Sequence, residues 1–124
     1  MKRAHKRLDV WRESMTLATD IYKLTELFPK SEIYGLASQM RRAAVSVPSN
    51  IAEGAARRSS KEFSQFLNIA GGSLSELDTQ LEIAANLEYL SLEKRQSIDH
   101  QVSAIAAKLA GLIKNVRNKV EMKT

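Results

Sequence analysis

The sequence predicts an all-α protein, folded as an antiparallel up-down-up-down four-helix bundle. Apolar residues recur at alternating steps of three and four along four segments, which is the spacing of helices that pack on one another. The connections between these segments are short, so consecutive helices are expected to be antiparallel neighbours. Alanine and leucine recur throughout the 124 residues whereas 6% are aromatic, a balance that favours closely packed helices.

The first helix is predicted from Val10 to Phe28, with Asp9 as its N-cap and Pro29 as its stop. We expect the aromatic residues Trp11 and Tyr22 to pack in the core rather than to stack on nucleobases. The apolar stripe of this helix comprises Val10, Leu17, Ile21, Leu24 and Phe28, widened by Trp11, Met15, Ala18 and Tyr22.

The second helix is predicted to start at a Ser31 cap, with Glu32 in its first turn. Pro48 falls within it, removing one backbone donor and crowding the preceding turn. We therefore expect one bent helix, kinked near Ala44 to Pro48; the alternative is two shorter helices, the second capped by Ser46. The apolar seam runs through Ile33, Leu36, Met40, Ala43, Val47, Ile51 and Gly54.

The third helix is predicted to start with a capping box, in which Ser59 is followed three residues later by Glu62. Gly71 and Gly72 lie in its middle, where they would let another backbone approach closely. Its apolar seam comprises Phe63, Phe66, Ala70, Leu74, Leu77, Leu81 and Ala84.

The fourth helix is predicted to follow a turn at residues 88–90 and to be capped by Ser91. Its seam comprises Ile98, Val102, Ile105, Leu109, Leu112, Val116 and Val120. These boundaries predict one domain, the bundle at residues 9–120, with a basic N-terminal arm at 1–8 and a C-terminal tail at 121–124.

Composition narrows the class of protein and its compartment. Cysteine is absent, which excludes disulfides and thiolate metal sites. No apolar run approaches the roughly 20 residues of a transmembrane helix. The basic start of the chain is not followed by the apolar segment of a signal peptide. We expect a soluble cytoplasmic protein.

A net charge of +5 and a pI near 9.6 predict attraction to polyanions. Acids alone carry charge from Glu62 to Glu88, so one helix is acidic and its neighbours are basic. The basic clusters are Lys2, Arg3, Lys6 and Arg7; Arg41, Arg42, Arg57, Arg58 and Lys61; and Lys108, Lys114, Arg117, Lys119 and Lys123.

The candidate nucleic-acid-binding residues are those of the second cluster: Arg41, Arg42, Arg57, Arg58 and Lys61. Arginine grips phosphate through two nitrogens at once. The alternative is that these residues pair with the acidic third helix, within or between subunits. We expect this structural role for Arg42 and the nucleic-acid-binding role for Arg58. The N-terminal cluster is either a solvated tail or an RNA-contacting arm in which His5 is available to stack.

The segment from Ser49 to Gly54 is predicted to be structural. Asn50, Glu53 and Arg57 stand at i, i+3 and i+7, on one face of a helix. We interpret Asn50 and Glu53 as a polar layer that sets helix register, with Glu53 and Arg57 as an ion pair, and Gly54 as a packing contact. The alternative is a nucleic-acid or partner site.

No catalytic or metal site is predicted. The two histidines, His5 and His100, have no partner at metal-ligand spacing, and the Glu-x-x-His pattern of di-iron bundles is missing. A serine nucleophile would lack a base outside those histidines. We expect a protein that is not an enzyme and that binds no cofactor.

A set of short motifs follows the helices in a recognisable order: Leu8-Asp9-Val10-Trp11, Phe28-Pro29, Glu32, Tyr34-Gly35-Leu36, Gln39, Arg41-Arg42-Ala43, Ser46, Asn50-Ile51-Ala52-Glu53-Gly54, Arg57, Phe63, Phe66-Leu67, Ile69-Ala70, Gly72-Ser73, Glu76-Leu77, Gln80-Leu81 and Tyr89-Leu90-Ser91. In these motifs the chain resembles the bacterial four-helix-bundle proteins encoded within intervening sequences of 23S ribosomal RNA genes, relatives of the accessory variability proteins of diversity-generating retroelements. This resemblance implies a homopentamer around a central channel, with basic surface suited to RNA and no enzymatic activity.

Three functions are consistent with these residues. The first is a non-enzymatic, ring-like homo-oligomer that binds RNA through arginines of the second helix and of the loop that follows it. The second is an accessory module that docks a nucleic-acid enzyme such as a reverse transcriptase. The third is a structural oligomer without any ligand, which predicts no retention on RNA even at low salt.

Overall fold

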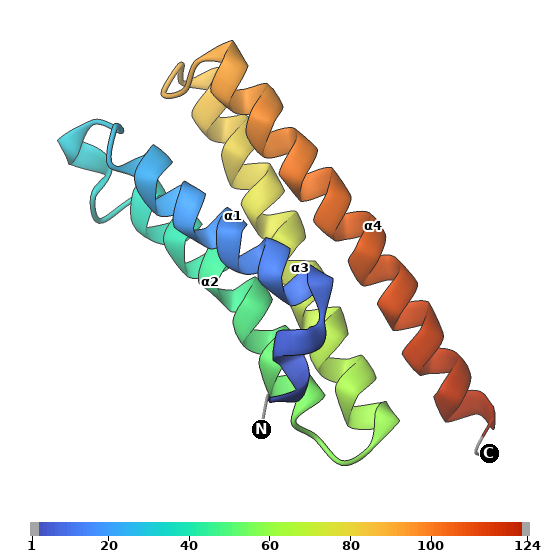
Figure 1. Cartoon of the computed structure of the whole chain (residues 1–124). Helices are drawn as coiled ribbons and strands as arrows, with labels where there is room; N and C mark the ends of the chain where they lie inside the picture. The colour runs from blue at the N-terminus through green and yellow to red at the C-terminus, as the bar shows by residue number, and fades with distance from the viewer. Residues whose placement is uncertain (1–2, 123–124) are drawn as a thin grey trace.

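The computed structural model describes residues 3–122, and within them the chain is all-α, with no strand. Four long helices run in alternating directions (Figure 1), in agreement with a four-helix bundle, and a short 3-10 helix precedes each of the first two. The elements are η1 (Ala4–Arg7), α1 (Asp9–Thr25), η2 (Lys30–Glu32), α2 (Leu36–Ala55), α3 (Ser60–Asn86) and α4 (Leu92–Met122).

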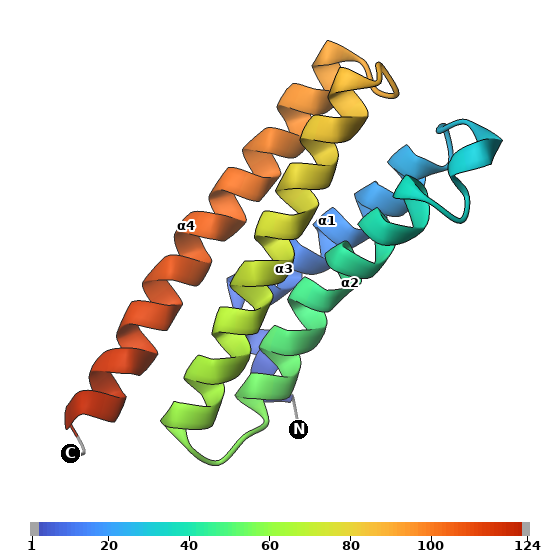
Figure 2. The same cartoon turned by 180° about the vertical axis from the view of Figure 1, so that it is seen from behind.

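Neighbours in sequence are neighbours in space. The most extensive packing is between α2 and α3, followed by α3 with α4 and α1 with α2, whereas α1 touches α4 least. Figure 2 shows, from behind, that α3 lies between α4 and α2. The α1–α2 and α3–α4 connections lie at one end of the bundle, and the α2–α3 connection lies at the other, together with η1 and the last turns of α4 (Figure 1).

The core is built from the predicted seams. The apolar stripes of α3 and α4 are buried or half-buried throughout, and in α1 the residues Val10, Leu17, Ile21 and Leu24 are buried. The helix ends at Thr25, earlier than predicted, and Phe28 is buried three residues beyond its end. Ile33 was expected in the seam of α2, but this prediction is wrong and 55% of the residue is exposed. It precedes the first residue of α2, so it does not share the buried face of that helix.

Two predicted helix caps are wrong. The N-cap of α1 is Leu8, and Asp9 is the first helical residue, where it pairs with Arg12. Ser31 lies inside η2, and the side chain that serves the start of α2 is that of Glu32, whose Oε1 accepts a hydrogen bond from the Leu36 backbone N–H at 3.1 Å. A carboxylate can replace a hydroxyl here because it accepts from free N–H groups and favours the positive end of the helix.

The caps of α3 and α4 are confirmed. Ser59 Oγ accepts from the backbone N–H of Glu62, and Ser91 Oγ accepts from that of Lys94, both at 3.1 Å. The predicted turn between the two helices contains Glu88 at a φ of 62°. The backbone N–H of Tyr89 donates to the Ala84 carbonyl at 2.9 Å, closing α3 with the bonding pattern usually made by glycine.

α2 is one continuous helix through Pro48, which is buried, so the alternative of two helices with a Ser46 cap is wrong. The kink stays a prediction. The expected close backbone approach at Gly71 and Gly72 is also wrong within the described chain. A Cβ on Gly71 would lie 3.8 Å from Leu109 Cδ2, and one on Gly72 would meet nothing within 4 Å.

Candidate nucleic-acid interface

The five predicted binding residues do not form one patch. Arg41 and Arg42 lie on the first half of α2, whereas Arg57, Arg58 and Lys61 surround the α2–α3 connection. Fifteen residues separate Arg42 from Arg57, which corresponds to roughly 20 Å along a helix. The two groups therefore have different surroundings and need separate roles.

Arg41 is held by α1. Its Nε donates to Thr25 Oγ1 at 2.8 Å and its Nη2 donates to the Tyr22 carbonyl at 3.2 Å. The guanidinium carbon also lies 4.7 Å from the centre of the Tyr22 ring. Because a cation near the last carbonyls of a helix is favourable, these contacts give Arg41 a structural role between α1 and α2.

Arg42 is exposed and lines a polar groove between α2 and α3. The same groove is lined by Glu76 of α3, which brings an opposite charge near, although the described residues include no ion pair between the two side chains. Both alternatives for Arg42, pairing with the acidic third helix and phosphate binding, therefore stay predictions.

Arg57 is partly engaged, whereas Arg58 and Lys61 are not. Arg57 Nη2 lies 3.4 Å from Glu53 Oε1, with 41% and 56% of the two side chains exposed, and its guanidinium lies over the Phe66 ring at 4.8 Å. An exposed ion pair of this kind is worth about 1 kcal/mol or less, so it leaves Arg57 available to phosphate. Within residues 3–122, Arg58 and Lys61 are exposed and have no hydrogen bond or ion pair.

The Asn50 side chain belongs to a polar layer between α2 and α3. Its Nδ2 donates to the Ser46 carbonyl at 2.8 Å and to Ser46 Oγ at 2.9 Å, and Ser46 Oγ lies 2.8 Å from Ser73 Oγ of α3. At Gly54, an added Cβ would lie 2.7 Å from Phe66 Cβ. Both residues therefore fit the structural interpretation, whereas Glu53 is exposed and pairs with Arg57.

The topology of the bundle separates charge between its two ends. One end, which we name the basic pole, gathers ten exposed cations from both ends of the described chain and the α2–α3 connection: Arg3, Lys6, Arg7, Arg12, Arg57, Arg58, Lys61, Lys114, Arg117 and Lys119. Four acids accompany them, a difference of +6: Asp9, Glu53, Glu62 and Glu121. The predicted cluster members Lys2 and Lys123 lie outside the described residues.

The opposite half of the bundle, which we name the acidic pole, carries six cations and nine acids, a difference of −3. Its acids are Asp20, Glu26, Glu32, Glu76, Asp78, Glu82, Glu88, Glu93 and Asp99, and its cations are Lys23, Lys30, Arg41, Arg42, Lys94 and Arg95. Like charges gathered at one end produce a field that a scattered distribution of the same net charge would not.

The ion pairs between helices involve other residues than the predicted ones. Arg95 of α4 pairs with Glu82 of α3, and Lys108 of α4 pairs with Glu13 of α1. The hydrogen bond from Lys108 to Glu13 raises the pKa of Lys108, since the carboxylate favours the charged ammonium. Within the described residues, none of the five predicted arginines and lysines pairs with an acid of α3.

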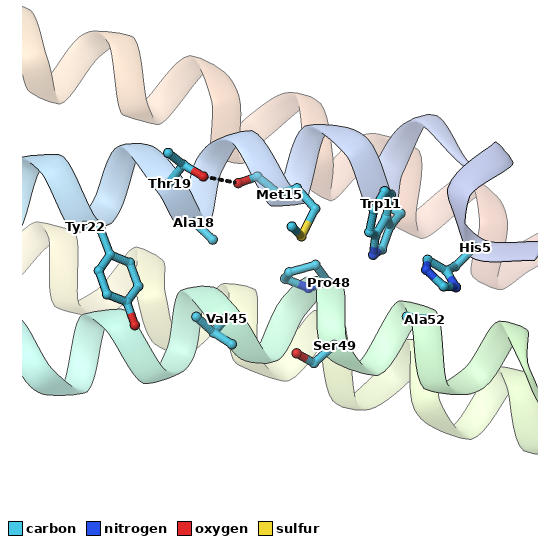
Figure 3. A pocket seen from close by; sticks show the side chains of 10 residues that line it. All are labelled: His5, Trp11, Met15, Ala18, Thr19, Tyr22, Val45, Pro48, Ser49 and Ala52. Carbon is cyan, nitrogen blue, oxygen red and sulfur yellow. Dashed lines mark hydrogen bonds between the residues drawn. The ribbon is translucent and has the colours of Figure 1, made fainter. Parts of the chain in front are cut away.

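A groove between α1 and α2 is the feature that the sequence did not predict (Figure 3). It has a volume of about 510 Å³ and apolar walls. Met15 and Tyr22, expected to widen the core, are 43% and 44% exposed here, and Trp11 is half-buried. The lining residues are His5, Trp11, Met15, Ala18, Thr19, Tyr22, Val45, Pro48, Ser49 and Ala52.

No metal centre is found in the part of the chain that the structure describes, where no three histidine, aspartate or glutamate side chains lie close enough to share an ion. His5 contacts Trp11, with the ring centres 4.8 Å apart. None of the described helices combines the length and the apolar character required to cross a bilayer.

The family model of the 23S rRNA-intervening sequence proteins matches residues 6–111. The chain belongs to this family. The matched range contains η1, the groove-lining helices and the α2–α3 connection, whereas Lys114, Arg117 and Lys119 lie beyond it. The predicted resemblance to the family is thus confirmed.

A solved structure is similar over most of this chain. It is the 1.70 Å crystal structure of a protein of unknown function from the S23 ribosomal protein family of Bacteroides thetaiotaomicron VPI-5482. The two chains share 28% identity with a TM-score of 0.79, and the similarity covers 85% of this chain and 98% of the other. No curated protein matches this chain.

Proposed function

We propose that this member of the 23S rRNA-intervening sequence family is a non-enzymatic, cytoplasmic RNA-binding protein that holds phosphates at its basic pole. The observation that carries the proposal is the convergence of ten exposed cations, from segments far apart in sequence, at one end of the bundle. An end of the bundle with a charge difference of +6 attracts a polyanion through the field of all its cations together.

Arg57, Arg58 and Lys61 are the primary phosphate contacts in this proposal. Arg58 and Lys61 have no competing partner among the described residues. The Arg57 guanidinium packs over the Phe66 ring, and its side chain stays exposed to solvent. Each phosphate that they neutralise releases counterions. We expect nonspecific affinity per pole of about micromolar or weaker at physiological salt, decreasing steeply as salt increases.

The proposal includes assembly into a ring, with the number five taken from the family resemblance. Apolar side chains remain exposed on α3, including Ile69 at 51% and Ile83 at 44%, and the surface at Gly72 is open. Exposed apolar residues of this kind are what a subunit contact would cover. In a cyclic assembly the basic poles would be repeated around the axis. One RNA could then contact several poles at once and bind more tightly than to a single pole.

The test is native mass spectrometry with and without a single-stranded RNA, together with a binding titration. Replacing both Arg57→Ala and Arg58→Ala should weaken RNA binding roughly tenfold at physiological salt, because two phosphate contacts are lost, while the oligomer mass stays the same. The matched control removes two cations from the acidic pole, Lys30→Ala with Lys94→Ala, and should leave binding unchanged. Equal binding by all three proteins would remove the basic pole from the proposal.

A second function has support at the acidic pole. Large apolar side chains are exposed there, with Leu27 at 74%, Leu92 at 70% and Tyr34 at 97%. Acidic surface with exposed apolar residues suits a basic protein partner such as a reverse transcriptase. A reverse-transcriptase gene beside this gene would favour that function, whereas a position inside a ribosomal RNA gene would favour RNA. The third possibility, a structural oligomer, is favoured if RNA does not retain the protein at low salt.

A further inference from the structure

The groove between α1 and α2 extends from η1, at the basic pole, to Tyr22 in the last turn of α1. On α1 it is lined by Trp11, Met15 and Tyr22, so the two aromatic rings are eleven residues and roughly 16 Å apart along the helix. Val45 and Pro48 of α2 face them across the groove, and Figure 3 shows these side chains directed into the space between the helices.

Each end of the groove has an aromatic ring beside a basic group. At the η1 end, the His5 ring lies against Trp11 at an interplanar angle of 64°. At the other end, the Arg41 guanidinium covers Tyr22. The indole N–H of Trp11 has no acceptor among residues 3–122, so a ligand that offers a carbonyl or ring nitrogen could satisfy it.

The charges around the groove favour an anionic ligand. Lys6 and Arg7 follow His5 on η1, where they belong to the basic pole, and Arg41 lies at the far end of the groove. Among the described residues that line the groove there is no acid. Aromatic rings on an apolar floor, bordered by cations, are the elements by which proteins bind single-stranded nucleic acid without reading its sequence.

We infer that this groove receives unpaired nucleobases of the RNA whose phosphates are held at the basic pole, with Trp11 and Tyr22 as stacking surfaces. The inference rests on the proposed RNA-binding function. A second copy related by a two-fold axis is a poorer occupant, because that contact would bring the same cations together, and a copy bound through a different face is an outcome of the test. A duplex is also a poorer ligand, because its bases remain stacked inside the helix.

The experiment uses Trp11, the single tryptophan of the chain, as a fluorescent probe within the groove. Titration with a single-stranded oligouridylate at low salt should quench its emission in proportion to binding, followed independently by fluorescence anisotropy of an end-labelled oligonucleotide. An abasic oligomer with the same number of phosphates should bind at the basic pole and leave the emission unchanged. An RNA duplex should behave as the abasic oligomer does.

A pair of tyrosine variants isolates stacking from folding. Tyr22→Leu keeps an apolar side chain in the groove and should weaken oligouridylate binding about tenfold, without effect on the abasic oligomer. Tyr34→Leu makes the same chemical change at a residue that is 97% exposed and outside the groove, and should have no effect.

The possible failures are distinct. Equal affinity for oligouridylate and the abasic oligomer, with Trp11 emission constant, would overturn the inference. It would still support phosphate binding at the basic pole. No binding of either oligomer would overturn both proposals. Emission that changes with protein concentration in the absence of RNA would show that another copy covers the groove, and would also overturn the inference.

Discussion

Single residues decide how closely α2 and α3 approach. The sequence predicted that Gly54 is a packing contact and that Asn50 belongs to a polar layer, and both residues lie where α2 meets α3. The glycine was informative because glycine inside a helix lowers the stability of that helix, so its presence indicates a close contact that a larger residue would block. The same reasoning failed for Gly72, around which the chain leaves open space, so a glycine alone does not reveal whether a neighbour is present.

Gly54→Ala should destabilise the protein by about 1–3 kcal/mol, because the new methyl group would lie 2.7 Å from Phe66 Cβ and 3.0 Å from Phe63 Cδ1. The gain of about 1 kcal/mol in helix propensity offsets part of that cost. Gly72→Ala is the control and should be neutral or stabilising by up to about 1 kcal/mol. Urea unfolding followed by circular dichroism measures both; equal shifts in midpoint would contradict the prediction.

At the scale of the helices, periodicity identified the buried faces but not what covers them. The stripe of α1 was predicted to be wide, and its central residues are buried. Its flank, with Trp11, Met15 and Tyr22, instead lines a groove. Whether the side of an apolar stripe is covered depends on the distance to the neighbouring helix. The apolar pattern of a single helix does not determine that distance. The cap at Glu32 was missed for a similar reason, since a 3-10 turn displaced the start of α2.

The two connections at the acidic pole are joined by Tyr89, whose hydroxyl donates to Glu32 Oε2 at 2.8 Å. This hydrogen bond raises the pKa of Tyr89 above its ordinary 10.0, because the acceptor favours the neutral phenol. A raised pKa in the folded state contributes stability that is complete below the unfolded pKa and is lost as pH rises through the folded one.

Tyr89→Phe should therefore be less stable than the parent by a constant amount up to about pH 10, and the difference should shrink above it. Urea unfolding at a series of pH values from 8 to about 11.5 measures the difference. Lys108 also has a raised pKa and titrates in both proteins, so the subtraction removes its effect. A difference that stays constant to the highest pH would show that the hydrogen bond does not link Tyr89 ionisation to folding.

For the whole molecule, the two poles follow from charge order and topology together. The sequence located three basic clusters and one acidic helix, but it placed Arg41 and Arg42 in the same binding set as Arg57. Helix length separates them, and the return of the chain brings Lys114 and Arg117 of α4 to the end that η1 and the α2–α3 connection occupy. The fold class could be predicted from the local spacing of apolar residues. The two charged poles could not, because they depend on which helix ends lie side by side in the folded chain.

The basic pole predicts a steep dependence of RNA binding on salt. If three phosphates are contacted by Arg57, Arg58 and Lys61, a fourfold decrease in salt should strengthen single-strand binding about 20-fold. The variant that lacks Arg57 and Arg58 should show a slope of log affinity against log salt that is lower by about 1.4. Anisotropy titrations at four salt concentrations give both slopes, and parallel lines would exclude these arginines as phosphate contacts.

An even number of antiparallel helices returns the polypeptide to the end where it began, so the described chain starts and finishes on the cationic side of the bundle (Figure 1). Affinity tags or fusion partners attached to either terminus would therefore stand in the way of incoming RNA. The reverse turn at Glu88, on the opposite side, is the suitable insertion point for a reporter or immobilisation peptide. Proteins tethered there would present the cationic surface outward.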